Sequence, residues 1–276
     1  MEKQTKLVFK VKRLLKRLGC PRWLHHFGPK TYEFWQHVTA LLAKAYCRLS
    51  YRRVIQLFDL LGMTCPKKSA LQTMAAKLDS HFWQNVLKAT SRKAYIVALD
   101  AKGLSRTNPS YHYLKRIDGK RPQKYVKLNA AFDTRHKKFC AAKVRVLPAH
   151  DLKDANQLIQ QSNPRIVVAD KGYVSEKLYK YAHEQGILLM MPKKKNAKKG
   201  FFRKKMHKAF RQKTYNLRSL VEAGFGAAKR KYGSSVSSRK ARTIRTEVLG
   251  RLACHNLFGW VFQDSGQSPF NARGAK

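Results

Sequence analysis

The sequence has few acidic residues. Only 15 of its 276 residues are Asp or Glu, against 59 Lys and Arg, which gives a formal net charge of +44 at pH 7. A chain with this charge repels itself unless a polyanion or counterions screen it. The charge therefore predicts nucleic acid as the main partner. Charge alone does not separate a DNA-processing enzyme from ribosomal or packaging proteins, which are also basic.

The sequence also lacks the patterns of several other protein classes. Its five cysteines are odd in number and never form a C-x-x-C pair, and its ten histidines never show H-x-x-x-H spacing, which argues against a disulfide framework or a zinc site. No apolar run reaches the ~18 residues of a membrane span. The basic N-terminal stretch has no apolar core or cleavage site of a secretory signal. We therefore expect an intracellular protein without a membrane partner.

The hydrophobic fraction of 43% is enough to build a core, and the apolar spacing divides the chain. Residues 31–92 have apolar residues at helical spacing and predict a helical DNA-binding domain. Residues 93–262 predict a catalytic domain that contains strands. The two ends, residues 1–30 and 263–276, are expected to be a basic arm and a tail with little order.

The helical domain has the outline of a helix-turn-helix. Ser50 is a suitable N-cap for a helix over residues 51–61, and a second helix begins again over residues 69–78. The DNA-binding interpretation places the second helix in a groove of DNA, where four side chains are candidate contacts: Lys67, Lys68, Gln72 and Lys77. The alternative is an ordinary helical hairpin whose basic face is merely solvated.

The second domain alternates strands and helices. Apolar and β-branched runs predict strands over residues 94–99, 125–132, 139–147, 165–169 and 187–191, and helices over residues 151–161, 176–185 and 243–262. This order predicts an α/β fold with a mixed sheet flanked by helices. A Lys/Arg-rich run over residues 193–213 is interpreted as a DNA-backbone contact in preference to a solvated loop.

Two aspartates in this domain follow buried strands. Asp100 ends the first strand and Asp170 ends the strand over residues 165–169. In open α/β sheets, ligands bind just outside the carboxyl ends of the strands. The two acids are therefore expected to meet at one edge of the sheet. An aspartate in this position, taken alone, is more often a turn former or a helix cap.

A third candidate acid lies on a helix. Tyr215, Arg218, Glu222 and Lys229 are separated by three, four and seven residues, so at about 100° per residue they form one polar stripe. Apolar residues gather on another face, which lets this helix pack on the sheet while it presents the acid. The alternative is a solvated helix with an Arg218-Glu222 ion pair, which contributes only ~0.2–0.5 kcal/mol.

With these residues in place, the sequence resembles the DDE transposases of bacterial and archaeal insertion sequences that bear the Y-R-E-K signature. The likeness rests on Asp100 after a first strand, Asp170-Lys-Gly-Tyr173 after a later one, and Tyr215-x2-Arg218-x3-Glu222-x6-Lys229 on a helix. It covers residue 94 to about residue 262. The resemblance implies an RNase H-like fold with Asp100, Asp170 and Glu222 as the catalytic and metal-binding triad.

The chemistry of three carboxylates agrees with this resemblance. Oxygen donors without His or Cys suit Mg²⁺ or Mn²⁺, and two such ions can activate a nucleophile and stabilise the leaving oxygen of a phosphodiester. We therefore expect a transposase that cleaves element ends and joins each 3′-OH to target DNA, with Tyr215, Arg218 and Lys229 holding the strand. Two ends must be brought together, which predicts a homodimer. The resemblance implies the nucleoid of a prokaryotic cytoplasm as its location.

Two other functions stay open. A basic, non-catalytic DNA-binding protein, such as a decayed or domesticated transposase, would keep the charge and the helix-turn-helix and carry the carboxylates as relics. An RNase H-like nuclease would cleave strands without joining them.

Overall fold

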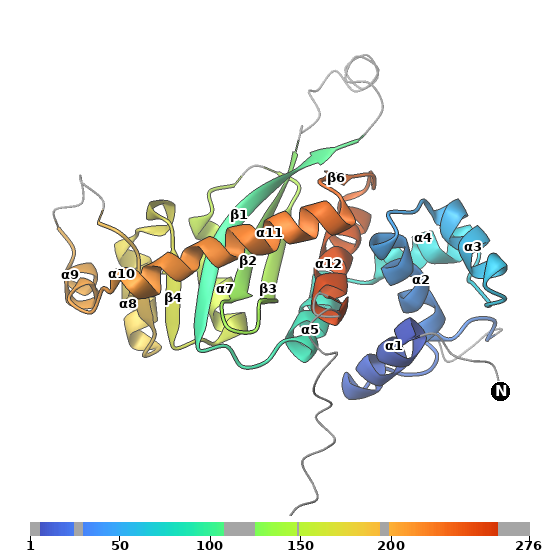
Figure 1. Cartoon of the computed structure of the whole chain (residues 1–276), viewed down its shortest axis with the longest axis horizontal. Coiled ribbons are helices and arrows are strands. Elements are labelled where there is room, and N and C mark those ends of the chain that lie inside the picture. Colours follow the sequence, from blue (N-terminus) through green and yellow to red (C-terminus); the bar gives the residue numbers. More distant parts are fainter. Residues whose placement is uncertain (1–5, 25–29, 108–124, 148, 194–198, 259–276) are drawn as a thin grey trace, which may run out of the picture.

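The computed structural model describes residues 6–24, 30–107, 125–147, 149–193 and 199–258. Figure 1 shows a group of N-terminal helices beside a sheet that carries helices on both faces. No helix within these ranges is long and apolar enough to cross a bilayer. The predicted tail over residues 263–276 lies outside the described residues.

Five helices precede the sheet. They are α1 (Lys6–Arg17), α2 (Phe34–Tyr46), α3 (Tyr51–Leu60), α4 (Lys68–Lys77) and α5 (Ser80–Thr90). Helices α3 and α4 fall where the sequence predicts the two helices of the helix-turn-helix, and they pack on α2 and on each other. Ser50 is the expected N-cap of α3, because its Oγ accepts a hydrogen bond from the Arg53 N–H at 3.2 Å. Gly62, with φ +63°, turns the chain after α3.

The prediction of a poorly ordered arm over residues 1–30 was wrong for Lys6–Arg17. This segment forms α1 and buries Val8, Val11, Leu14 and Leu15, which recur at helical spacing. The segment was predicted to be poorly ordered because the basic side chains between these apolar residues make its overall composition strongly polar. Helix α1 packs against α2 and α5 and so belongs to the N-terminal helical part.

Six strands in the described residues form one mixed sheet. They are β1 (Ile96–Arg106), β2 (Tyr125–Asp133), β3 (Lys138–Arg145), β4 (Ile166–Ala169), β5 (Leu188–Met190) and β6 (Ser235–Val236). The order is β3-β2-β1-β4-β5, and β6 pairs with the end of β1. Strands β1, β2 and β3 are antiparallel neighbours, whereas β4 and β5 continue the sheet in parallel with β1. The expected α/β fold, a mixed sheet flanked by helices and preceded by N-terminal helices, is confirmed.

Strand β1 is longer than the sequence pattern predicts. Asp100 was expected to end it, but the strand continues to Arg106 because β2 pairs with it as far as Ser105. Beyond Asp100 the run of apolar residues stops, since Lys102 and Gly103 are exposed. The pairing with β2 therefore extends the strand where hydrophobic patterning gives no signal.

Helices cover both faces of the sheet. Helices α7 (Leu152–Ser162) and α8 (Glu176–Glu184) enclose one core, and α11 (Ser219–Tyr232) and α12 (Ala241–Phe258) enclose the other. Short elements connect them: η1 (Lys171–Tyr173), α9 (Phe201–His207), α10 (Gln212–Tyr215) and η2 (Asn216–Arg218), of which η1 and η2 are 3₁₀ turns. In Figure 1, α11 crosses the sheet in front of β1 and β2.

The core beneath α11 and α12 extends into the N-terminal helices. It joins Leu42 of α2 and Trp83 of α5 with Phe132 of the sheet and Leu249 of α12. The Trp83 indole N–H donates to the Thr246 Oγ of α12 at 3.2 Å. Although residues 92–93 mark the change from helices to strands, they do not divide the core. This shared core fixes α4 relative to the start of α12.

Candidate active site

Asp100 and Asp170 lie on neighbouring strands at the same level of the sheet. Strand β1 pairs in parallel with β4, so that Leu99 lies opposite Ala169, and each aspartate directly follows its paired residue. Neighbouring strands are about 4.8 Å apart. The two aspartate backbones are therefore adjacent as the sequence predicts, although only Asp170 lies at the end of its strand and β1 continues past Asp100.

Asp100 lies on the face of the sheet that α11 covers. Successive side chains of a strand point to opposite faces. Ala98 and Leu104, which share the parity of Asp100, belong to the core beneath α11 and α12, whereas Val97 and Leu99 belong to the core beneath α7 and α8. Alternation therefore directs the Asp100 carboxyl group toward the helix that carries Glu222.

Arg218 and Glu222 lie opposite Asp100. A guanidinium nitrogen of Arg218 is 2.8 Å from a carboxylate oxygen of Glu222, one helical turn further along. The turn η2, which ends at Arg218, contacts both β1 and β4. The predicted stripe therefore begins at the end of α10, passes through this 3₁₀ turn and continues in α11, so it does not lie on one regular helix.

The electrostatics of Asp100 depend on this neighbourhood. Burial raises the pKa of Asp100 above its ordinary value, and the negative charge of Glu222 also acts to raise it. The Ala101 backbone N–H, Lys102 and Arg218 act in the opposite direction. Glu222 is more accessible, since its side chain is 46% exposed. The ionised form of Asp100 thus depends on nearby positive charge, and an incoming cation would add to that charge.

Gly224 allows α11 to approach the sheet closely. A Cβ atom at this position would lie 2.6 Å from a ring carbon of Phe132 on β2, well inside van der Waals contact. The Phe132 ring is itself buried, 5.0 Å from the ring centre of Phe139. Glycine is therefore required for this contact, which sets the height of the neighbouring Glu222 above the strands.

Lys229 and Tyr215 lie at the two ends of the stripe. The Lys229 ammonium donates to the backbone carbonyl of Gly103 at 2.9 Å, so it lies further along β1 than Asp100. Partial burial and the charge of Lys102 lower the pKa of Lys229. Tyr215 packs its ring 5.7 Å from that of Phe210 and contributes to the electrostatic surroundings of Arg218. The stripe therefore follows β1 beside the two aspartates.

The carboxylates do not form a closed metal site. Within the described part of the chain, no three His, Cys, Asp or Glu side chains are grouped closely enough to hold a metal ion. Asp100 and Asp170 provide oxygen donors at adjoining positions of two paired strands, and such donors suit hard ions such as Mg²⁺. The Glu222 carboxylate is occupied by Arg218. The structure thus brings two of the three predicted ligands together and pairs the third with a cation of the protein.

The four predicted DNA contacts of the second helix lie on the surface. Lys67, Lys68, Gln72 and Lys77 are all exposed at or on α4. Lys68, Gln72 and Lys77 line a groove between α4 and the start of α12. Three of the predicted contacts thus share their surface with residues 237–243, which precede and begin α12.

The basic run over residues 193–213 contains a packed helix. Its residues 194–198 lie outside the described residues, and α9 follows with Arg203 and Met206 buried. The Glu176 carboxylate accepts the backbone N–H of Phe202 at 2.8 Å and so joins α8 to the start of α9. Part of the run is therefore folded. The two interpretations given from the sequence, a DNA-backbone contact and a solvated loop, now apply to the exposed lysines of this folded segment.

Lys102 is a site residue that the sequence interpretation did not identify. It lies two residues after Asp100, so alternation directs it to the same face, and its charge affects the pKa of both Asp100 and Lys229. It was missed because the strand was expected to stop at Asp100. If the alternation of strand side chains is continued from Asp100 to Leu104, Lys102 falls on the same face as both.

Comparisons with known proteins agree with the sequence resemblance. A family model described as the transposase DDE domain matches residues 91–257. Among curated proteins, none matches the chain in sequence. The chain is similar to the piggyBac transposase in a cryo-EM structure of its synaptic complex with hairpin DNA, with 12% identity, a TM-score of 0.41, and coverage of 92% of this chain and 73% of that one. It is also similar to the Drosophila P element transposase in its strand transfer complex, with 10% identity, a TM-score of 0.39, and coverage of 89% and 70%.

Proposed function

The chain belongs to the transposase DDE domain family, and from that premise we propose that it cleaves DNA at the ends of an insertion sequence and joins the 3′-OH ends to target DNA. The reaction is phosphoryl transfer, first to water and then to the exposed 3′-hydroxyl. Double-stranded DNA is the substrate, both as element end and as target. Two copies of the chain hold the two ends together, at the nucleoid of a prokaryotic cell. Its membership of the Y-R-E-K group remains a prediction.

One observation carries the assignment of residues. Asp100, within β1, and Asp170, directly after β4, adjoin on paired strands, and Arg218 and Glu222 lie above Asp100 at the start of α11. We assign Asp100, Asp170 and Glu222 as the catalytic carboxylates. This arrangement supports the assignment because Asp100 and Asp170 adjoin on paired strands and Glu222 is near enough to act on the pKa of Asp100.

Proteins of this family normally use divalent metal ions. In this chain Asp100, Asp170 and Glu222 would hold Mg²⁺ or Mn²⁺, which supplies a lowered pKa for the attacking water and stabilises charge on the phosphate oxygens. Three other side chains of the stripe position the DNA strand. Arg218 and Lys229 hold phosphates that flank the scissile bond, and Tyr215 fixes the position of the same strand.

The Arg218-Glu222 ion pair connects DNA binding with the carboxylates. In the free protein the guanidinium neutralises Glu222 at 2.8 Å. A DNA phosphate competes for the guanidinium through two parallel N–H···O bonds. When Arg218 turns to a phosphate, Glu222 is released to join the two aspartates. Binding of the substrate thus precedes completion of the site.

The experiment is Mg²⁺-dependent cleavage of a labelled duplex that carries an element end. A bound ion contributes several kcal/mol to phosphoryl transfer, and each ~1.4 kcal/mol is tenfold in rate. Asp100→Asn, Asp170→Asn and Glu222→Gln are therefore each expected to slow cleavage by about 10²–10³-fold or more while DNA affinity is retained.

Two conservative changes serve as controls. Asp59→Asn alters an exposed acid of α3, and Glu184→Gln alters an exposed i,i+4 pair with Lys180 on α8. Both should cleave at the wild-type rate. Wild-type cleavage by any of the three carboxylate variants would remove that residue from the site, and a wild-type protein that binds DNA without cleaving it would support the non-catalytic alternative.

A further inference from the structure

A basic groove of about 950 Å³ lies between α4 and the segment that leads into α12. One wall comes from α2, α3 and α4, and the other from residues 237–243. Six cationic side chains line it: Lys44, Lys68, Lys77, Arg239, Lys240 and Arg242. The other lining side chains are mostly Ser, Thr and Gln, and among the described residues no acid lines this groove. The groove therefore presents a strongly positive, hydrogen-bonding surface.

Three helices begin at this groove. Helix α3 starts at Tyr51, α4 at Lys68 and α12 at Ala241, and residues at each start line the groove. A helix N-terminus carries partial positive charge and free backbone N–H groups. Their convergence adds to the field of the six cationic side chains. The backbone and the side chains thus favour the same kind of ligand, an anion.

Lys44 is a buried cation of the groove. It is only 8% exposed, and its ammonium lies 4.8 Å from the ring centre of Tyr51. Burial lowers the pKa of Lys44, although the charge of Glu247 partly opposes the effect. The Tyr51 ring and the negative charge of Glu247 both attract this ammonium from within the protein. An anion in the groove would add a further attraction on the Lys44 ammonium.

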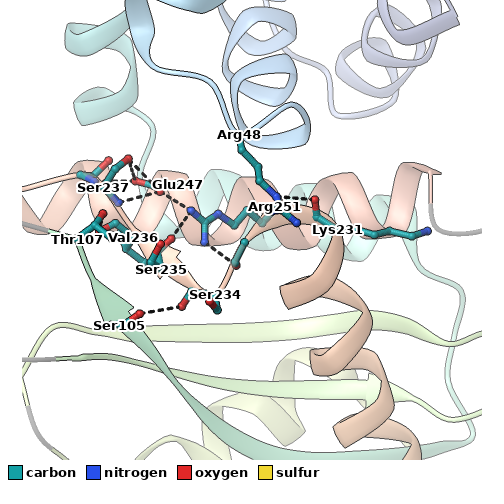
Figure 2. A network of polar contacts seen from close by, with 12 residues as sticks. Arg48, Ser105, Thr107, Lys231, Ser234, Ser235, Val236, Ser237, Glu247 and Arg251 are labelled. Atoms are coloured by element: carbon teal, nitrogen blue, oxygen red, sulfur yellow. Dashed lines mark hydrogen bonds and ion pairs between the residues drawn. The ribbon is translucent and has the colours of Figure 1, made fainter.

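The wall formed by residues 237–243 is held in place by a polar network (Figure 2). The Glu247 carboxylate accepts the backbone N–H groups of Ser237 at 3.2 Å and Ser238 at 2.8 Å. It also pairs with Arg251 at 2.5 Å, whose guanidinium donates to the carbonyl of Ser235. This carboxylate and guanidinium are themselves almost fully buried. The wall is therefore preformed before any ligand arrives.

The same network joins the wall to the helical part. Arg48, after α2, donates to the backbone carbonyls of Arg230 and Lys231 at the end of α11, the latter at 3.0 Å. Figure 2 shows this side chain reaching from the N-terminal helices toward the residues around Arg251. The two walls of the groove consequently keep a fixed spacing.

We propose that this groove binds the sugar-phosphate backbone of duplex DNA, and that it holds the substrate of the transposase function proposed above at a distance from the carboxylates. Ser, Thr and Gln side chains, Lys and Arg, and helix N-termini are the usual donors to DNA phosphates. Binding of single-stranded DNA relies on exposed aromatic platforms for base stacking. The one aromatic side chain lining this groove, among the described residues, is Tyr51, and its ring is occupied by Lys44.

The test compares salt-dependent DNA binding of charge-matched variants. The probe is a fluorescein-labelled 25-bp duplex of mixed sequence, because backbone contacts are independent of sequence. Each phosphate contact contributes about −0.9 to the slope of log K against log[salt]. Arg239→Ala/Arg242→Ala removes two exposed cations of the groove and should reduce the slope by up to ~1.8. Lys88→Ala/Lys153→Ala removes two exposed lysines of α5 and α7 and should leave it unchanged.

An isosteric pair of variants separates binding from folding. Gln72→Glu places one negative charge in the groove, and Gln160→Glu places the same charge on the exposed surface of α7. Gln72→Glu should weaken binding about tenfold, whereas Gln160→Glu should not. Equal effects of the two double variants, or of the two glutamate variants, would overturn the groove as a binding site. A loss confined to single-stranded DNA would overturn the duplex assignment.

The outcome is distinct from the test of the proposed function. If wild type cleaves end DNA and the groove variants bind like wild type, the groove inference fails alone. If the groove variants lose binding as expected and wild type does not cleave, the proposed transposase reaction fails alone.

Discussion

Gly224 and Gly226 offer a matched test of how α11 is placed on the sheet. Both are interior to the same helix, so replacement of either by Ala brings the same gain of about 1 kcal/mol in helix propensity. Their surroundings differ. A Cβ at Gly224 would lie 2.6 and 2.8 Å from two ring carbons of Phe132, whereas a Cβ at Gly226 would meet only a guanidinium nitrogen of Arg230 at 3.3 Å.

The steric cost at Gly224 follows from the surroundings of the ring. Phe132 is 2% exposed and packs on Phe139 and His255, so it has no free space to move into. Overpacking of this kind costs typically 1–3 kcal/mol. The Arg230 side chain is exposed and can move away from a new methyl group. Because the propensity gain is common to both variants, the difference between them equals the steric cost.

We therefore expect Gly224→Ala to be less stable than Gly226→Ala by about 1–3 kcal/mol in urea unfolding. Gly226→Ala should be as stable as wild type or more stable by up to ~1 kcal/mol. Gly224→Ala should also cleave DNA more slowly, because α11 carries Glu222 two residues away. Equal stability of the two variants, or normal cleavage by Gly224→Ala, would refute the close approach of helix and sheet.

Two further predictions concern the stripe. Arg218→Lys keeps the positive charge but loses the planar guanidinium that can donate two parallel hydrogen bonds. Both Arg218→Lys and Arg218→Ala should therefore be slow in single-turnover cleavage with saturating Mn²⁺. Near wild-type rates for both would mean that Arg218 only forms an ion pair worth ~0.2–0.5 kcal/mol. Lys229→Ala should impair cleavage and assembly of the end complex, yet leave Mn²⁺ binding to the free protein unchanged in calorimetry, because the Lys229 ammonium contacts the Gly103 carbonyl. Weakened Mn²⁺ binding would contradict that role.

The parts of the fold that periodicity dictates were predictable. The buried strands before Asp100 and Asp170 and the apolar faces of α7 and α8 depend on local patterns of two and 3.6 residues. The capping of α3 by Ser50 followed from local chemistry in the same way. Such features are encoded within a single element, so one sequence is enough to find them.

The errors have a common physical origin in contacts between distant segments. The continuation of β1 past Asp100 depends on pairing with β2, and the stability of α1 depends on packing against α2 and α5. The groove beside α4 depends on residues 237–243, which lie more than 150 positions further along the chain. Neither the composition nor the periodicity of one segment predicts its contacts with a distant segment. The Arg218-Glu222 ion pair, in contrast, was recognisable in the sequence as the alternative to the functional stripe, because its partners are one helical turn apart.

The partners of the few acidic side chains also give evidence about the site, and this evidence does not depend on any related protein. Most described acids are engaged in structure, in ion pairs or at helix starts: Glu33 with Arg22, Asp133 with His136, Asp151 with Lys127, Asp154 with Arg145, Glu184 with Lys180, Glu247 with Arg251, Asp79 at α5 and Glu176 at α9. Within the described residues Asp100 and Asp170 form no ion pair, although the chain has 59 basic residues. Asp59 is also unpaired, but it stands exposed on α3. In the described part of the chain these two adjoining carboxylates form no direct ion pair, and Lys102 and Arg218 act on Asp100 only through their charge, so both carboxylates keep oxygen atoms that a cation from outside the chain could contact.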